Sequence, residues 1–472
     1  MSNVVIFSAI ISHITGIEVM FQYEASDDTG DQMPDQVNVT FITETKFLTK
    51  FNLRRSQSFD VDIPLYTLDI DREGFFQSRK VKTRPRKDIG YYHDINKAVF
   101  CIKRSPEKLS NRNFKFHLKA VFQMDNSEYL FDSDNKTHKK PWRNLSLETF
   151  SSPTRNESTT PRSRTTFDRY VYKLELLRRT SFDLFDTQIP PPEVEKTVRW
   201  AVINQSTPWS DQPSRRRRNA MRDYYVDVVA LIDKKRFRWF LQQAKEHYTN
   251  AMQNIQEHYA MMFSGIDMFY NGINHPNYTV HIRLCKIFVL QQPNASIFID
   301  KYASDDKLNS PQALKALENF FVGAGHLIVG FYDYVMLFTG YDLFKYDNSG
   351  KNKIYTYAGS TYVGTMCRTD GTSCGVVEDY EGPDIRAIAH ELGHSLSAKH
   401  DGDGNDCFNS DRYIMNNGLK RKQTPETKYN PWRFSACSVK YFTKFLTENP
   451  SNRVQKTLKL RTYVIQCIVE IP

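Results

Sequence analysis

The chain has 472 residues, with 64 Lys and Arg against 54 Asp and Glu, and seven cysteines. Because single hydrophobic cores stop growing near about 250–300 residues, this length predicts at least two folding units. Apolar residues make up 40% and charged residues 25%, which excludes a largely disordered chain. No stretch approaches the roughly 20 apolar residues of a membrane-spanning helix, so we expect a globular protein that does not cross a membrane.

The net charge of +10 raises nucleic acid as a partner class. Residues 1–218 carry 35 basic and 28 acidic residues, and residues 219–472 carry 29 and 26. Four of the basic residues form a single run: Arg215, Arg216, Arg217 and Arg218. The others lack the clustered, aromatic-interleaved face that contacts phosphates, so we expect no nucleic-acid partner.

Residues 1–18 contain the short apolar region of a signal peptide, but they lack a basic start and His13 interrupts them. A degraded signal peptide and a buried first strand both remain open. Secretion is favoured by cysteines along the whole chain and by seven Asn-x-Ser/Thr glycosylation sites, at Asn38, Asn135, Asn144, Asn156, Asn204, Asn277 and Asn294. We therefore expect a secreted, extracellular, disulfide-bonded glycoprotein.

Residues 19–150 alternate strand-like runs, such as Val37–Phe41 and Phe114–Phe122, with turn clusters, which predicts a β-rich domain. Residues 151–218 are rich in Ser, Thr, Pro and Arg and are interpreted as a linker. Its four terminal arginines repel one another and stay solvated, as the substrate site of a proprotein convertase must be. A solvated linker that is not cut is the alternative.

Beyond the arginines, Tyr224–Ile232 is typical of the first strand of a new domain, residues 219–472. Apolar residues recur every three or four positions from Phe237 to Ile266, which predicts one long amphipathic helix. Strand-like runs follow at Tyr278–Leu290 and Tyr334–Thr339, with a helix near Pro311–Phe321 between them. This alternation predicts an α/β architecture with a mainly parallel sheet.

The segment His390-Glu391-Leu-Gly-His394 places two histidines on one face of a helix, with Glu391 beside them. His400 lies six residues further on, so the chain must turn back to bring it to the same metal ion. Three neutral imidazoles leave a fourth zinc position for water, which is typical of a catalytic site. Glu391 is then the expected general base in attack on a carbonyl. An ordinary charged helix face is the alternative.

At these residues the chain resembles the metzincin zinc endopeptidases, and more narrowly the reprolysins (adamalysin/ADAM type). Asp401 follows the third histidine as in that family, and Tyr413-Ile-Met415 is similar to its Met-turn, in which Met415 would form an apolar floor. Similar segments are Tyr362–Cys367, the strand at the cleft, and Phe434–Cys437, the start of the C-terminal helix. The resemblance covers about residues 219–472 and implies a metzincin catalytic domain with a mixed, mainly parallel sheet, long helices and an active-site helix.

Over residues 40–135 the resemblance to a family propeptide is looser and rests on Tyr91–Asp94 and Cys101. Cys101 is either a buried propeptide cysteine or a thiolate that occupies the fourth zinc position in a latent zymogen. The segments Ser360–Gly364 and Cys367 to Asp379 are most similar to the secreted metalloproteases of tick saliva.

The resemblance also implies disulfides and a second metal. Six cysteines lie in residues 219–472 and allow fifteen pairings, among which the family suggests Cys367–Cys467, Cys407–Cys437 and Cys285–Cys374. The resemblance implies a calcium ion near Asp227, Asp333, the Cys467 carbonyl and Glu470. The alternative is that the three acidic residues are ordinary surface acids.

One residue departs from the family pattern. Ser397 stands where the family has a glycine, at a turn that a side chain disfavours by roughly 1–2 kcal/mol. The sequence therefore predicts a zinc endopeptidase made as a zymogen, which cuts extracellular or host proteins, is activated by a convertase and is a monomer. A catalytically weak or inactive binding protein on the same metzincin fold is the alternative, and zinc content separates the two.

Overall fold

The computed structural model describes residues 17–138 and 222–448, each with short gaps, and residues 164–167, 171–176 and 187–189. The chain divides into two compact units. Unit 1 comprises Met1–Gln57 with Arg86–Thr180, and unit 2 comprises Ser58–Pro85 with Ser181–Pro472. This division differs from the predicted one, because Ser58–Pro85 belongs to the unit that contains the histidine motif. The predicted signal region, apart from its last two residues, lies outside the described residues.

Unit 1 is β-rich, as its alternating pattern predicts. Its strands are β1 (Ile17–Ala25), β2 (Gln36–Ile42), β3 (Phe47–Arg55), β6 (Ile89–Asp94), β7 (Ala98–Leu109), β8 (Asn113–Met124), β9 (Ser127–Asp132), β10 (Lys136–His138), β11 (Arg164–Phe167) and β12 (Val171–Leu176). They form one sheet in the order β10-β12-β9-β8-β7-β6-β3-β2-β1-β11, and β12 also pairs with β1. Strand β12 therefore closes the sheet on itself.

The core of unit 1 is aromatic. Phe41 lies within 4.9–6.5 Å, centroid to centroid, of the rings of Phe51, Phe100, Phe122 and Phe131. Strands β11 and β12 lie in the segment predicted to be a linker. The Ser- and Arg-rich composition hides the run Val171-Tyr-Lys-Leu-Glu-Leu176, which alternates as a half-buried strand does.

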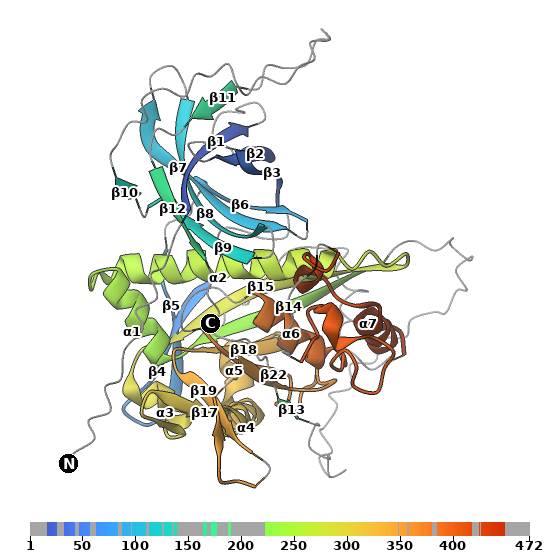
Figure 1. Ribbon diagram of the computed structural model, residues 1–472. Helices are drawn as coiled ribbons and strands as arrows, with labels where there is room; N and C mark the ends of the chain where they lie inside the picture. The colour runs from blue at the N-terminus through green and yellow to red at the C-terminus, as the bar shows by residue number, and fades with distance from the viewer. Residues whose placement is uncertain are drawn as a thin grey trace, which may run out of the picture. The chain divides into compact units, whose positions relative to one another are not determined.

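Unit 2 is a layered α/β unit with a mainly parallel sheet, as predicted (Figure 1). Its strands are β4 (Leu65–Ile70), β5 (Phe76–Lys80), β13 (Thr187–Ile189), β14 (Arg222–Ile232), β15 (Tyr278–Leu290), β18 (Tyr334–Thr339), β21 (Gly359–Tyr362) and β22 (Cys374–Glu378). Their order is β13-β21-β22-β18-β14-β15-β4-β5, and only β21–β22 and β4–β5 are antiparallel. A small second sheet contains β16 (Ala303–Ser304), β17 (Lys307–Asn309), β19 (Asp342–Tyr346) and β20 (Lys353–Ile354).

The helices of unit 2 are α1 (Lys234–Gln243), α2 (Tyr248–Asn271), α3 (Pro293–Asp300), α4 (Ser310–Phe320), α5 (His326–Val329), α6 (Ile385–Ser395) and α7 (Ala436–Glu448). The single long helix predicted from Phe237 to Ile266 is therefore two helices. Lys245 and Glu246 have φ of 51° and 62°, outside the helical region. The apolar spacing continues across this break because both helices bury a face of similar period.

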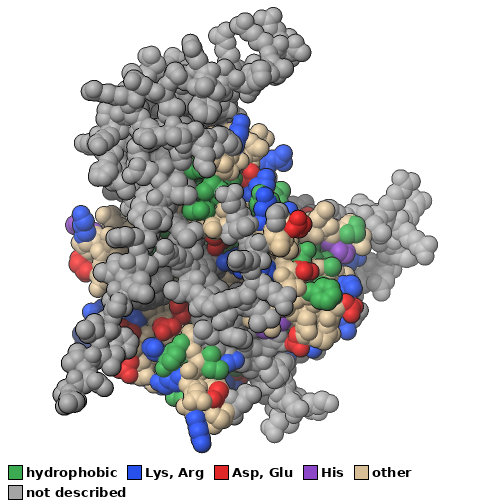
Figure 2. Space-filling model, in the orientation of Figure 1, with side chains coloured by type: hydrophobic (Ala, Val, Ile, Leu, Met, Phe, Trp, Pro, Cys, Tyr) green, Lys and Arg blue, Asp and Glu red, His purple; other side chains and the backbone are tan. Residues whose placement is uncertain are grey.

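No described helix is long and apolar enough to cross a membrane. On the face drawn in Figure 2, the Lys and Arg side chains of the described residues are interspersed with Asp and Glu.

A buried ion pair joins the helices of unit 2 to the central sheet. Arg236 on α1 and Asp379, just after β22, each expose 1% of the side chain, and Arg236 Nε donates to Asp379 Oδ2 at 2.9 Å. The Tyr259 hydroxyl on α2 donates to the same oxygen at 2.7 Å. Burial alone would raise the pKa of the Asp379 carboxyl, but Arg236 and His258 hold it at about 2.

We predict that Asp379→Asn lowers the free energy of unfolding by about 3–5 kcal/mol near neutral pH, because it leaves the Arg236 charge buried without its counterion. The matched control is Asp342→Asn, which removes a half-exposed partner of Lys307 and should cost at most about 1 kcal/mol. Urea unfolding monitored by fluorescence measures both.

The stability that the Asp379 ion pair contributes should depend on pH in one direction. The pKa of Asp379 lies below its ordinary value of 3.8, so its contribution is present above about pH 4 and is lost as the pH falls through about 2. The difference between Asp379→Asn and the unmodified chain should shrink over that range. Equal stabilities of the two proteins at pH 7 would contradict the proposed role of this ion pair.

Candidate metal centre

Helix α6 carries the first two histidines of the motif. Its apolar residues, among them Ile388 and Leu392, are fully buried, and His390 and His394 are buried with 1% and 0% exposure. The Tyr270 hydroxyl on α2 donates to the Ala389 carbonyl at 2.9 Å, which fixes α6 against α2. The helix is therefore a rigid support for both imidazoles.

Three imidazole nitrogens converge on one point. His390 Nε2 lies 3.0 Å from His394 Nε2, and His400 Nε2 lies 3.3 Å from each of them. Zinc with nitrogens at about 2.0–2.1 Å in a tetrahedral arrangement places those nitrogens about 3.3 Å apart. Within the described residues, this is the one group of three or more His, Cys, Asp or Glu side chains that is placed to hold a metal ion.

The other ring nitrogens fix the tautomers of the two helical histidines. His390 Nδ1 lies 2.6 Å from the Ile414 carbonyl, and His394 Nδ1 lies 2.6 Å from the Ala398 carbonyl. A carbonyl only accepts, so we assign the proton to Nδ1 in each ring. Each Nε2 then presents a lone pair to the centre, and such second contacts orient metal-binding histidines.

The turn after α6 has the form of a Schellman motif. Ala398 N donates to the Gly393 carbonyl at 3.0 Å, and Ser397 N donates to the His394 carbonyl at 2.8 Å. The left-handed position of this motif is usually glycine, and here Ser397 occupies it with φ of 73°. The prediction that Ser397 stands at a conformation unfavourable to a side chain is confirmed.

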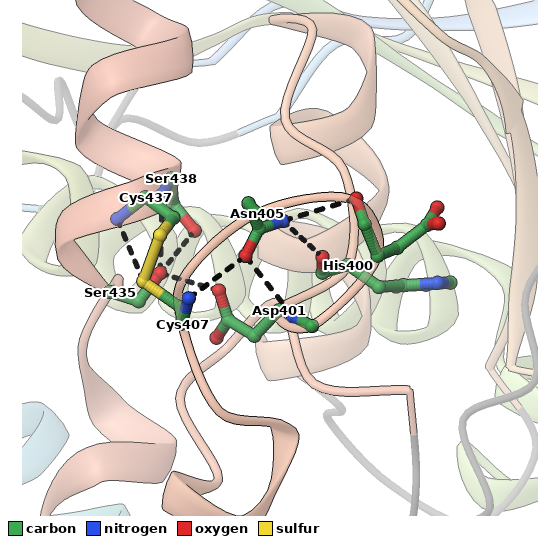
Figure 3. Close-up of a disulfide and its surroundings, with 9 residues drawn as sticks. His400, Asp401, Asn405, Cys407, Ser435, Cys437 and Ser438 are labelled. Atoms are coloured by element: carbon green, nitrogen blue, oxygen red, sulfur yellow. Dashed lines mark hydrogen bonds between the residues drawn. A yellow bond between two sulfur atoms is a disulfide. The ribbon is translucent and has the colours of Figure 1, made fainter.

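A polar loop then brings His400 to the centre (Figure 3). Asn405 Nδ2 donates to the His400 carbonyl at 2.8 Å, while Asn405 Oδ1 accepts from the backbone N–H groups of Gly402 and Cys407 at 3.1 and 3.2 Å. One amide side chain thus fixes three points of the loop. His400 points its ring away from the disulfide that closes the loop on the other side.

The same loop is tied to α7. The Ser435 hydroxyl donates to Asp401 Oδ1 at 2.6 Å, and both residues are buried. A disulfide joins Cys407 to Cys437, a pairing that the family resemblance implied. Asp401 N donates to the Met415 carbonyl at 2.9 Å. The residue after the third histidine therefore anchors the loop.

Met415 lies beneath the histidine helix. It is fully buried, and a Cβ added at Gly393 would come within 2.6 Å of its sulfur. Gly393, between the two helical histidines, therefore allows the helix to approach this side chain closely. Since the neighbouring Ile414 carbonyl receives the His390 Nδ1 proton, the segment supports the site by packing and by hydrogen bonding.

Glu391 is buried, with 1% exposure, and approaches strand β21 at Gly359. A Cβ added at Gly359 would lie 2.6 Å from Glu391 Oε1 and 2.8 Å from its Cγ and Cδ. The missing side chain at Gly359 leaves the volume that the Glu391 carboxyl group occupies.

Two predicted ligands of a calcium site lie together, and two lie outside the described residues. Asp333 Oδ2 accepts from Asp227 N at 2.9 Å. The Asp227 side chain receives Arg283 Nε at 2.8 Å, so a cation would compete with a guanidinium for this carboxylate. Cys467 and Glu470, like the arginines of the predicted cleavage site, are not described.

The predicted disulfide Cys285–Cys374 is not formed, since Cys374 bonds to no other described cysteine. Cys285 lies on β15 and Cys374 begins β22, with β14 and β18 between them in the sheet. Three strand spacings amount to about 14 Å, whereas bridged Cα atoms lie within about 7 Å. The pairing Cys367–Cys467 involves an undescribed residue. Cys101 is buried on β7 of unit 1.

Two residues with a role at the site were not predicted, Asn405 and Gly359. Asn405 stands in the run Asp401-Gly-Asp-Gly-Asn-Asp-Cys407, whose composition is typical of a tight loop and was available as a signal. Gly359 has no local signal, because its contact with Glu391 joins segments more than thirty residues apart.

Comparison with known proteins agrees with this geometry. Residues 343–456 match the family model described as Reprolysin (M12B) family zinc metalloprotease. The chain is 28% identical over 242 residues, or 49% of its length, to human "A disintegrin and metalloproteinase with thrombospondin motifs 10". It is 26% identical to the human protein numbered 7 of that series, over 70% of the chain, and 26% identical to the gon-1 protein of Caenorhabditis elegans, over 59% of the chain.

The aligned part spans only 19%, 17% and 12% of the lengths of these three relatives. Together, the family match, the relatives and the three-histidine site support a reprolysin-type zinc metalloprotease. Similarity to the tick proteins stays a prediction.

We predict that Gly359→Ala displaces the Glu391 carboxyl group and lowers kcat about 10- to 100-fold, because small misplacements of a reacting group cost this much. Zinc content should be unchanged, since the three atoms nearest to the new methyl group all belong to Glu391 and not to a histidine. The matched control is Gly272→Ala, at the C-cap of α2, where φ of −73° and ψ of −1° suit alanine. Metal analysis and steady-state hydrolysis of a peptide test the pair. Wild-type kcat in Gly359→Ala would refute the close contact.

Proposed function

We propose that unit 2 is a zinc-dependent endopeptidase that hydrolyses internal peptide bonds of extracellular proteins. The observation that carries the proposal is the convergence of three Nε2 atoms within 3.0–3.3 Å. The buried Glu391 follows the first of these histidines on α6. His390, His394 and His400 are the proposed metal ligands. The family match over residues 343–456 supports the same reaction class.

The three histidines fit a zinc ion, because their number, their nitrogen ligand atoms and the spacing of those atoms are all suitable. Three neutral imidazoles form an open site, and zinc bound there would supply Lewis-acid chemistry to a scissile carbonyl and to water. Glu391 follows His390 directly on α6, and its buried carboxyl group lies against Gly359 of β21. We assign to Glu391 the proton taken from the attacking water, which it then delivers to the leaving amine. Met415 and the His390 contact with the Ile414 carbonyl hold the ligands in place.

The zymogen proposal is supported at the edge of the sheet next to α6. Strand β13 pairs in parallel with β21, with Thr187 opposite Ser360 and Ile189 opposite Tyr362. An extended peptide substrate binds most readily by adding to an exposed strand, and here that edge carries residues from before the predicted cleavage site. We propose that cleavage at Arg215–Arg218 by a proprotein convertase precedes activity.

Several finer features remain part of the proposal. We propose that the protein is secreted and acts as a monomer; the seven Asn-x-Ser/Thr sites support secretion. A calcium ion near Asp227 and Asp333 would have to share Asp227 with Arg283. The proposal that residues 1–18 form a signal peptide rests on the sequence. The proposal that the substrates are extracellular or host proteins rests on the sequence resemblance to the tick proteins.

A second function is favoured by one observation. Ser397 occupies a left-handed position, with φ of 73°, immediately between the second and third histidines. If this turn were too strained to hold His394 and His400 together, the fold would bind protein partners without cutting them. The 3.3 Å separation of these two Nε2 atoms weighs against that alternative.

We predict that Glu391→Gln lowers kcat at least 10²–10⁴-fold, because the amide cannot accept the proton of the attacking water. Zinc content should stay at the level of the unmodified protein. The control is Glu426→Gln, an exposed carboxyl group elsewhere in unit 2, which should hydrolyse casein at the normal rate. Full activity in Glu391→Gln would exclude the proposed base.

Replacing Ser397 distinguishes the enzyme from the binding protein. We predict that Ser397→Gly raises the free energy of unfolding by about 1 kcal/mol, since glycine adopts positive φ without a Cβ clash, and changes kcat less than about threefold. Thermal unfolding and peptide hydrolysis measure the two effects. A large gain in activity in Ser397→Gly would instead mean that the natural serine disables the site.

A further inference from the structure

Two strands of unit 2 come from the segment that precedes the predicted cleavage site. Strands β4 and β5 form a hairpin within residues 63–81, and β4 pairs in parallel with β15 from Leu65–Ile287 to Leu68–Leu290. The hairpin thereby extends the protease sheet beyond β15 (Figure 1). More than 130 residues of chain separate it from the four arginines.

The sequence of β15 is that of an interior strand where it contacts β4. From Tyr278 to Arg283 buried and half-buried residues alternate, as on a strand with one covered face. From Ile287 to Leu290 every residue is buried, with at most 1% exposure. This run is apolar on both faces, and without β4 it would be an uncovered hydrophobic edge, which folded proteins avoid.

The hairpin also contributes side chains to the core of unit 2. Leu68 belongs to the same buried cluster as Val229 and Leu337. Tyr66 stacks on Phe288 with ring centroids 4.9 Å apart. The contact is therefore a continuous piece of core.

Backbone groups and a second aromatic contact complete the junction. Ile287 N donates to the Pro64 carbonyl at 2.9 Å, and Gln256 Nε2 donates to the Ile63 carbonyl at 2.5 Å. Phe76 on β5 makes edge contacts with Phe320 at 4.9 Å and Phe298 at 6.2 Å.

The outer strand of the hairpin has the opposite character. After Phe76, β5 reads Gln-Ser-Arg-Lys, and these four residues are exposed. Charged residues of this kind protect a terminal strand from pairing with other chains. The turn is closed by Asp71, whose Oδ1 accepts from Phe75 N at 2.8 Å and whose Oδ2 accepts from Gln77 Nε2 at 2.7 Å. The sheet therefore has its natural edge at β5 and not at β15.

We propose that this hairpin is a permanent component of the protease fold: after cleavage at Arg215–Arg218 it stays bound to β15, so the active enzyme is a non-covalent two-chain complex. The inference rests on the proposed cleavage, because an uncut chain keeps the hairpin by connectivity. The partner of the β15 edge is thus a segment of the same polypeptide, recognised by strand pairing and by the ring contacts of Tyr66 and Phe76.

The test uses the full chain with residues 215–218 replaced by the recognition sequence of an added site-specific protease. After the cut and gel filtration, amide hydrogen exchange is measured on Leu65–Ile70 and on Leu284–Leu290. We expect co-elution of the two fragments and exchange within about twofold of the uncut protein. Separation of the fragments, or loss of protection at Leu284–Leu290, would overturn the proposal.

Two neighbouring phenylalanines provide a matched pair of variants. Phe76→Ala removes a core contact, whereas Phe75 is 70% exposed. In the cut protein, Phe76→Ala should speed exchange at Leu65–Ile70 at least a hundredfold and Phe75→Ala less than threefold. Equal rates in both variants would contradict the anchoring role of Phe76. If Phe76→Ala does not fold, the cut unmodified chain still decides the question.

These measurements need neither zinc nor catalysis. A failure of the peptidase proposal would show as a stable complex without hydrolysis, and a failure of the present inference as hydrolysis by a fragment that has lost the hairpin.

Discussion

Three imidazole lone pairs within 3.0–3.3 Å of one another repel unless a cation lies between them, and the structure around them serves to hold that arrangement. Two Nδ1 protons are committed to the carbonyls of Ile414 and Ala398, so neither ring can relieve the repulsion by turning its donor inward. The free energy needed to assemble such a group is recovered when the metal binds, which couples binding to local folding.

Because the three imidazoles must be held together against this repulsion, the residues that hold them come from distant segments of the chain. Helix α6 holds two rings by its own periodicity, but the third comes from a loop with no regular structure. That loop is fixed by the Asn405 amide, by the Asp401–Ser435 hydrogen bond and by the Cys407–Cys437 disulfide to α7. Ser397 adopts a strained backbone because the chain must reverse within six residues between His394 and His400.

Local pattern predicted much of this architecture and failed where distant segments meet. Strands β15 and β18 have the predicted bounds, because β15 alternates in its first half and is apolar at its end, whereas β18 is buried throughout, and both patterns are typical of strands. The break between α1 and α2 falls on Lys245 and Glu246, with no glycine or proline to signal it. The pairing of Leu65–Leu68 with β15 left no trace that composition or spacing could detect, and it moves a segment of the predicted propeptide into the protease unit.

The central claim is that the three histidines hold a catalytic zinc ion. Metal analysis of the purified chain, together with X-ray absorption at the zinc edge, tests it most directly. We expect one zinc per chain with three nitrogen neighbours at about 2.0–2.1 Å and an oxygen in the open position. A protein without zinc, or with zinc bound through sulfur, would contradict it.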